Sequence, residues 1–238
     1  MRQRKNRGLR CGDSCLDGMY RGLMLCRTGR GSLVIQELQK KGVQPLIGSS
    51  GMNNPLYILQ TLDRHLTRPA ELTIFGRAAL ALGFKNSSDV FAATHDVDAI
   101  LPLTWLSVPD ENLDFWEAQQ KTNIELEPSG LYITHLFREL EIILTPDWLA
   151  RRVPVQATLQ KLSVQRPSTL DLILSKMARG DENDLLDIRF LLQNEGISAD
   201  ELRSAFNRAR VPDLPEIRQL FKQAQPKVLE IARALQNR

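Results

Sequence analysis

Two aspartates separated by a single residue, Asp96 and Asp98, begin an apolar run in the stretch THDVDAILPL. Side chains alternate across a β-strand, so a strand here places both carboxylates on one face. Two close carboxylates repel each other unless a cation lies between them. Mg²⁺ prefers oxygen ligands and commonly binds one or two carboxylates together with substrate phosphates. The pair therefore predicts a magnesium site, with one or two ions suited to phosphoryl displacement; the alternative is a chance Asp-x-Asp.

A glycine at a predicted junction between a strand and a helix, Gly76 in IFGRAALAL, is the second candidate. Such a turn leaves backbone N–H groups facing an anion, and the N-terminus of the helix adds to the attraction. The next residue, Arg77, has the guanidinium geometry that pairs with phosphate through two N–H groups. The alternative interpretation is a glycine that only permits a tight turn, followed by a solvated arginine.

A cluster of both charge signs lies further along, in TLDLILSKMARGDENDLLDI. Lys176 and Arg179 share one face of a predicted helix, and Asp184 and Asp187 share a face of the next. Read alone, these residues are best explained as solvated charges or as ion pairs between two helices, which contribute little to stability at a surface.

Strands and helices alternate from Met52 onward, which predicts an α/β fold. The expected elements are a helix over 54–67 capped by Asn54, a strand over 71–76, a helix after it, a strand in HDVDAILPL, a helix after Asp110, and strands in GLYITHLF and ELEIIL. From Pro167 the chain reads as wholly helical, with Ser168 as a start signal and Gly196 as a stop signal. We therefore predict an α/β domain over 52–166 and a helical C-terminal subdomain over 167–238.

Residues 1–51 differ from the rest of the chain in composition. They carry ten of the 31 Lys and Arg residues but three of the 28 acidic ones, together with nine of the 14 glycines. Such a segment buries too little apolar surface to offset its ordering entropy, so we predict disorder. It is either a basic arm that binds nucleic-acid phosphates or sequence outside the native fold. Cys11, Cys15 and Cys26 lack the second Cys or His pair of a zinc site.

The remaining composition is that of a globular protein. Of the 238 residues, 42% are hydrophobic and 25% are charged, with a net charge of +3. No apolar run approaches the roughly 20 residues that span a bilayer, and the N-terminus makes a poor secretory signal. We therefore expect a cytoplasmic protein with no membrane partner.

The order of these motifs resembles the nucleotidyltransferase superfamily. A glycine turn is followed about twenty residues later by a T-x-D-x-D strand, and then by a distant D-L-x-x-x-K-x-x-R helix and a D-x-x-D. Within the superfamily, the strongest likeness is to minimal nucleotidyltransferase-like proteins grouped near the AbiEii-type toxins of bacterial toxin–antitoxin systems, and PDWLARRVPV at 146–155 is similar to that group. The likeness covers about residues 71–195 and implies a small mixed sheet flanked by helices.

The resemblance also implies roles at the strand end of the site. Gly76 takes the turn position, and Asp96 and Asp98 hold the nucleoside triphosphate through Mg²⁺, which is one ion or two. A third carboxylate often lies on a later strand in the superfamily. Glu141 in ELEIIL is the candidate for this third metal ligand, with Glu139 on the same predicted strand face.

The later helices are implied to bind phosphate. Lys176 matches a lysine that contacts the nucleotide phosphates in the AbiEii-like relatives, and Arg77 and Arg179 are placed to help it. An aspartate of the D-x-x-D, either Asp184 or Asp187, matches one that serves near the attacking hydroxyl.

The implied reaction is Mg²⁺-dependent transfer of a nucleoside monophosphate from a nucleoside triphosphate to an acceptor hydroxyl. The acceptor would be RNA, especially tRNA, or a protein, and an antitoxin protein would be a partner. The family commonly has Gly-Gly or Gly-Ser at the turn, whereas this chain has Gly76-Arg77. This departure keeps open a second hypothesis, an inactive nucleotidyltransferase fold that serves as a scaffold or regulatory protein.

Overall fold

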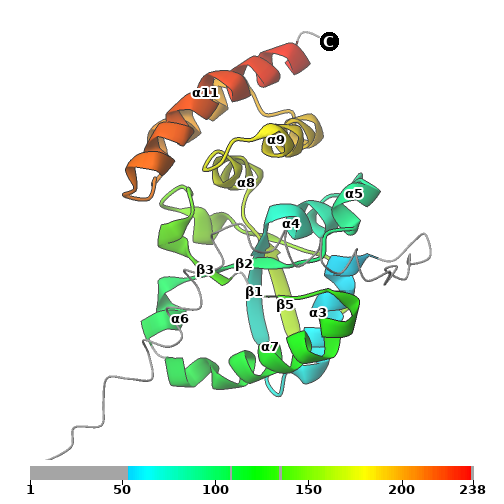
Figure 1. The fold of residues 1–238 in the computed structure, drawn as a ribbon. Helices are drawn as coiled ribbons and strands as arrows, with labels where there is room; N and C mark the ends of the chain where they lie inside the picture. The colour runs from blue at the N-terminus through cyan, green and yellow to red at the C-terminus, as the bar shows by residue number, and fades with distance from the viewer. Residues whose placement is uncertain (1–52, 108, 134–135, 237–238) are drawn as a thin grey trace, which may run out of the picture. The chain divides into compact units, whose positions relative to one another are not determined.

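The computed structural model describes residues 53–107, 109–133 and 136–236, and residues Gly51–Arg238 form one compact unit (Figure 1). The segment 1–51, for which we predict disorder, lies outside the described residues, as do its three cysteines. The division into 52–166 and 167–238 stays a prediction.

A five-stranded mixed sheet with the order β3-β2-β1-β5-β4 forms the centre of this unit. The middle strand β1 (Ala70–Phe75) pairs antiparallel with β2 (Asp98–Leu101) and parallel with β5 (Leu162–Arg166). At the edges, β3 (Leu136–Arg138) lies parallel to β2, and β4 (Val153–Pro154) lies antiparallel to β5. The predicted α/β fold with a small mixed sheet flanked by helices is confirmed.

The helices that precede and follow the first strands supply the main core. They are α3 (Asn54–His65), α4 (Gly76–Gly83), α5 (Asp89–Ala92) and α7 (Leu113–Leu126). Leu72 and Ile74 of β1 and Ala99 of β2 point into this core, where they join Ile58 and Leu62 of α3. Burial of alternate strand residues against a helical stripe removes apolar surface from water on one face of the sheet. Short elements complete this part: α6 (Leu103–Ser107), η1 (Pro109–Asn112) and η2 (Glu127–Ser129).

The other face of the sheet carries a smaller apolar cluster. Ile100 packs there with Ile142, Leu144 and Trp148, while Phe75 meets Phe137 edge-on at 5.4 Å between ring centroids. The chain covering this face includes two short 3₁₀ turns, η3 (Glu139–Glu141) and η4 (Trp148–Arg151). Because Phe75 pairs with Asp98, the aspartate lies on this second face.

The C-terminal part is helical, as predicted. It comprises α8 (Thr169–Lys176), α9 (Glu182–Glu195), α10 (Ala199–Arg208) and α11 (Pro215–Gln236), all above the sheet in Figure 1. The Ser168 hydroxyl caps α8 by accepting the Asp171 N–H, and Gly196 ends α9 with a φ of 60°. Both predicted helix signals are confirmed. Within the described residues, no helix is both long and apolar enough to cross a membrane.

Several predicted boundaries were wrong. Helix α3 is capped by Asn53 rather than Asn54, because the Asn53 side chain accepts the Leu56 N–H at 3.1 Å. The helix predicted to follow Asp110 begins at Leu113, since Asp110 lies within η1. The stretch KNSSDVFAAT, where no helix is among the expected elements, contains α5, whose N-cap is Ser88.

The strand predicted in ELEIIL is also wrong. Residues 139–141 form the turn η3, and Leu144 makes only an isolated bridge, to Arg210. In GLYITHLF, the described residues form β3 and an isolated bridge between Tyr132 and Asp96. The strands β4 and β5 had no counterpart among the sequence predictions.

Candidate nucleotide-binding site

The glycine turn and the second aspartate are in close contact. Gly76 follows β1 with a φ of +63°, a region that favours glycine. A Cβ at this position would lie 3.0 Å from Oδ2 of Asp98. Any side chain here would therefore press on the carboxylate as well as strain the backbone. Gly76 and Asp98, which the resemblance assigns to one site, are therefore adjacent in the structure.

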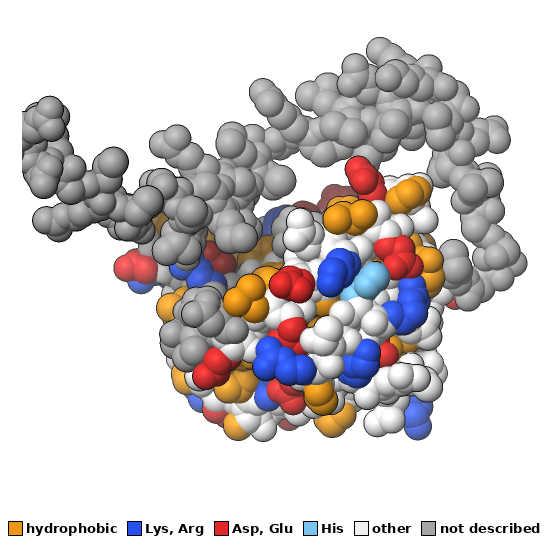
Figure 2. All heavy atoms as spheres, turned by 90° about the horizontal axis from the view of Figure 1, so that it is seen from below, with side chains coloured by type: hydrophobic (Ala, Val, Ile, Leu, Met, Phe, Trp, Pro, Cys, Tyr) orange, Lys and Arg blue, Asp and Glu red, His pale blue; other side chains and the backbone are white. Residues whose placement is uncertain are grey.

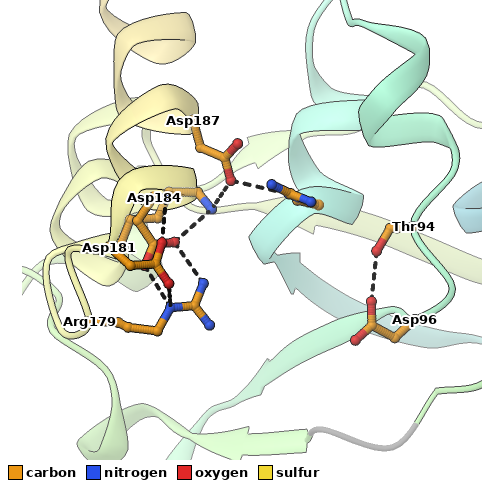
Figure 3. A network of polar contacts seen from close by, with 8 residues as sticks. Thr94, Asp96, Arg179, Asp181, Asp184 and Asp187 are labelled. Carbon is orange, nitrogen blue, oxygen red and sulfur yellow. Dashed lines mark hydrogen bonds and ion pairs between the residues drawn. The ribbon is translucent and has the colours of Figure 1, made fainter. Parts of the chain in front are cut away.

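The two aspartates of this strand flank a buried residue. Val97 is fully buried, whereas Asp96 and Asp98 are partly exposed, in agreement with the expected alternation. Asp96 lies just before β2, and its Oδ1 accepts a hydrogen bond from the Thr94 hydroxyl at 2.7 Å (Figure 3). Two partly exposed carboxylates beside a glycine turn are a donor set that fits Mg²⁺, which takes few protein ligands and completes its shell with water and phosphate.

The buried lysine of α8 lies between two aspartates of α9. Lys176 Nζ is 2.6 Å from Oδ2 of Asp187 and 3.7 Å from Oδ1 of Asp184. The three side chains retain 7%, 4% and 3% of their exposed surface, in that order. Buried charges persist only when they are paired, so these ionic contacts hold α8 and α9 together in this region.

Both arginines predicted to bind phosphate belong to the same network. Arg77 Nε is 3.4 Å from Oδ2 of Asp187, so this side chain leads from the glycine turn toward α9. Arg179 donates to both oxygens of Asp184 at 2.9 and 3.0 Å and also contacts Asp181. The hydrogen bond to Asp184 raises the pKa of Arg179 above its ordinary value.

The predicted site residues therefore form a connected series. Asp98 abuts Gly76, the next residue Arg77 contacts Asp187, and Asp187 binds Lys176. Figure 3 shows Asp96 and Thr94 on one side of this arrangement and the Asp187 cluster on the other. The residues of this series, separated by up to 111 positions (Gly76 and Asp187), are brought to one region of the fold.

A protein-family model described as "Nucleotidyltransferase of unknown function (DUF6036)" matches residues 57–220. The chain belongs to this family. The match contains every residue predicted for the site and supports the resemblance to the nucleotidyltransferase superfamily. No curated protein and no solved structure matches the chain. The likeness to AbiEii-type toxins stays a prediction.

Glu141, predicted as the third metal ligand, is not placed with Asp96 and Asp98. Glu141 lies in η3 and forms an ion pair with Arg138 at 2.7 Å on the surface. Glu139 accepts a hydrogen bond from the Trp148 indole at 2.6 Å and contacts Arg210. Across the described parts of the chain, no three His, Cys, Asp or Glu side chains form a group that could hold a metal. The error follows from the missing strand, since the turn directs both glutamates elsewhere.

Two residues of the site had no predicted role. Thr94 orients Asp96, and Asp181 both caps α9 and contacts Arg179. The threonine belongs to the T-x-D-x-D pattern, and an aspartate before a helix is a common cap. Those signals exist in the sequence, but the partners of each side chain depend on the tertiary fold.

Proposed function

We propose that the protein is a Mg²⁺-dependent nucleotidyltransferase that moves a nucleoside monophosphate from a nucleoside triphosphate to an acceptor hydroxyl. The observation that carries this proposal is the apposition of Gly76 to Asp98 on the strand end that also bears Asp96. The turn gives a triphosphate close access to the backbone directly beside two carboxylates. The family description supports the same class of substrate.

In this proposal, Asp96 and Asp98 hold the metal, and Thr94 fixes the orientation of Asp96. When bound, Mg²⁺ polarises the phosphate and offsets its charge. The acceptor oxygen forms a bond to the α-phosphorus, the bond from that phosphorus to the β-bridging oxygen breaks, and pyrophosphate leaves with the electron pair. The hydroxyl proton is released to water. Lys176 and Arg77 stabilise the negative charge of the phosphates.

The acceptor that we propose is RNA, and tRNA in particular; a protein acceptor is the alternative. From the AbiEii-like pattern we also propose a role in a toxin–antitoxin system, with an antitoxin protein as partner. The surface gives little support for broad nucleic-acid binding on the face of Figure 2, where acidic and basic side chains are interspersed. Ion pairs between α3 and α7, such as Arg64–Glu125, neutralise charge of both signs. An acceptor recognised at a confined region suits this surface better than one bound along a basic groove.

The deciding experiment incubates the full chain with Mg²⁺, each labelled nucleoside triphosphate and total RNA. We expect label in RNA or in protein, and at least a hundredfold loss with Asp98→Asn, because a carboxamide is a poor ligand for a divalent cation. Asp200→Asn, a matched change at a residue whose side chain is 90% exposed on α10, should retain full transfer. Equal labelling by the wild-type and Asp98→Asn proteins would refute the proposal.

A second candidate is a scaffold with this fold and no transfer activity. The observation in its favour is that Lys176 is already bound by two aspartates, while a large arginine follows the glycine turn. This candidate predicts no labelling of any acceptor by the wild-type protein, at any nucleotide or Mg²⁺ concentration. A single Asp98-dependent labelled product would exclude it.

A further inference from the structure

We infer that Asp187 is an internal counter-ion of Arg77 and Lys176. Its carboxylate oxygen lies between these two cations, at the position that a phosphate oxygen takes when a polyphosphate binds and displaces it. This inference rests on the proposed function, since it names what the same site must release before a triphosphate enters. Asp187 is then a positioning residue that acts through two cations, rather than the group near the attacking hydroxyl.

The geometry at Asp187 is that of an anion held by two cations. A single oxygen, Oδ2, lies 2.6 Å from Lys176 Nζ and 3.4 Å from Arg77 Nε. These cations come from different parts of the chain, the end of α8 and the start of α4. A phosphate oxygen bridges Lys and Arg side chains in the same way, because both anions offer charged oxygen acceptors to N–H donors.

The neighbouring aspartate differs in a way that makes the exchange feasible. Asp184 binds Arg179 through both oxygens, at 2.9 and 3.0 Å, and lies 3.7 Å from Lys176. It remains as a counter-charge for the buried lysine if Asp187 gives way. Arg77 keeps 37% of its side-chain surface exposed and contacts Asp187 through Nε, so it can turn toward a ligand at modest cost.

Competition with the Asp187 carboxylate also favours ligands that carry more negative charge. A ligand with several phosphates gains more from Lys176 and Arg77 than one phosphate does, whereas the cost of displacing Asp187 is the same for both. The site should thus discriminate against orthophosphate and accept a triphosphate chain. Removing the carboxylate charge should tighten binding and weaken this discrimination.

The test measures calorimetric binding of inorganic tripolyphosphate and of orthophosphate to the full chain, without metal and with a chelator present. We expect Asp187→Asn to bind tripolyphosphate about fivefold or more tightly than wild type, the lower end of typical coupling effects. Glu182→Gln removes the same charge from an exposed position of the same helix and should change affinity by less than twofold. Damage to the fold cannot produce tighter binding, so this readout separates exchange from a structural role.

Equal or weaker tripolyphosphate binding by folded Asp187→Asn protein would overturn the inference, as would absence of binding by both proteins. If Asp187→Asn does not fold, Arg77→Gln decides, because the inference requires it to weaken tripolyphosphate binding several-fold, and unchanged affinity would overturn it. If tripolyphosphate binding changes as expected but the wild-type protein transfers no nucleotide, the proposed function is refuted and the inference stands. If nucleotide is transferred but Asp187→Asn does not tighten tripolyphosphate binding, the inference is refuted and the proposed function stands.

Discussion

Two buried aspartates on consecutive helices, Asp171 of α8 and Asp187 of α9, are held in different ways. Asp171 is fully buried, and its Oδ1 accepts the N–H and the hydroxyl of Thr145, both at 2.8 Å. Its Oδ2 accepts the Ser168 hydroxyl at 2.6 Å and Arg151 Nη2 at 3.2 Å. Four donors therefore share the charge, and three of them are neutral.

Asp187, by contrast, is held by the charges of Lys176 and Arg77 at one oxygen. A network made mostly of neutral donors has no alternative ligand, because removing the carboxylate leaves the Thr145 backbone N–H buried without an acceptor. A pair of cations can accept any other anion. Burial of an acidic residue therefore does not by itself define its role. Whether its donors are mostly neutral or are cations distinguishes a structural aspartate from an exchangeable one.

The largest expected effect is on stability at Asp171. Asp171→Asn places an amide N–H₂ against either the Thr145 N–H or the Arg151 guanidinium, neither of which can accept a hydrogen bond, so we expect a loss of about 3 kcal/mol in the free energy of unfolding. Asp187→Asn should cost less, about 2 kcal/mol, because Lys176 keeps Asp184 as a counter-charge and the amide oxygen can still accept from Lys176. Urea denaturation of both variants measures the difference. Equal losses would break the distinction between the two aspartates.

Two glycines with positive φ, Gly76 beside Asp98 and Gly196 at the end of α9, allow the same comparison between a site residue and a structural residue. Gly76 and Gly196 have φ values of 63° and 60°, and an alanine at either should cost about 1 kcal/mol in backbone strain. A Cβ at Gly196 meets nothing within 4 Å, whereas at Gly76 it lies 3.0 Å from Asp98 Oδ2. We expect a larger loss of stability with Gly76→Ala, because the Asp98 carboxylate must shift, and a loss of nucleotide transfer with Gly76→Ala alone. Retained transfer by Gly76→Ala would show that the close contact has no catalytic consequence.

Local sequence signals accounted for most helices and for the outline of the site. The caps at Ser168 and Gly196 and the strand end at Gly76 depend on residues within a few positions of each other, so they can be read directly. The inner strand β5, between β1 and β4, was missed because its buried face carries an arginine. Arg166 is 4% exposed. Its guanidinium carbon lies 4.2 Å from the Phe84 ring centroid, and the side chain also contacts Glu195, so both partners are distant in the sequence.

The pairing of charges could not be predicted for the same reason. The spacing of Lys176, Asp184 and Asp187 predicts shared helix faces, but it does not say which aspartate binds the lysine. The contact from Arg77 to Asp187 joins residues 110 positions apart. Conversely, ELEIIL alternates as a strand should, yet Glu139 turns back to bind the Trp148 indole.

Asp63, a third buried aspartate, extends the comparison to a carboxylate held by backbone N–H groups. Asp63 accepts the backbone N–H groups of Gln160, Lys161 and Leu162 at 2.9, 2.7 and 2.7 Å. Burial acts to raise the pKa of Asp63, but the three N–H groups outweigh it and hold the pKa below its ordinary value. The contact therefore stabilises the fold fully above pH about 4, the unfolded value, and is lost as the pH falls through the lower folded pKa.

Asp63→Asn should lower the free energy of unfolding by about 1–2 kcal/mol at pH 7, since the amide retains one acceptor oxygen for three donors. The gap between wild type and variant should narrow as the pH falls below about 4, because protonation removes the advantage of the wild-type carboxylate. Urea denaturation across this range measures the gap, and Asp200→Asn is the exposed control with no comparable gap. A difference that stays constant with pH would mean that shape, rather than the charge on Asp63, holds α3 to the start of β5.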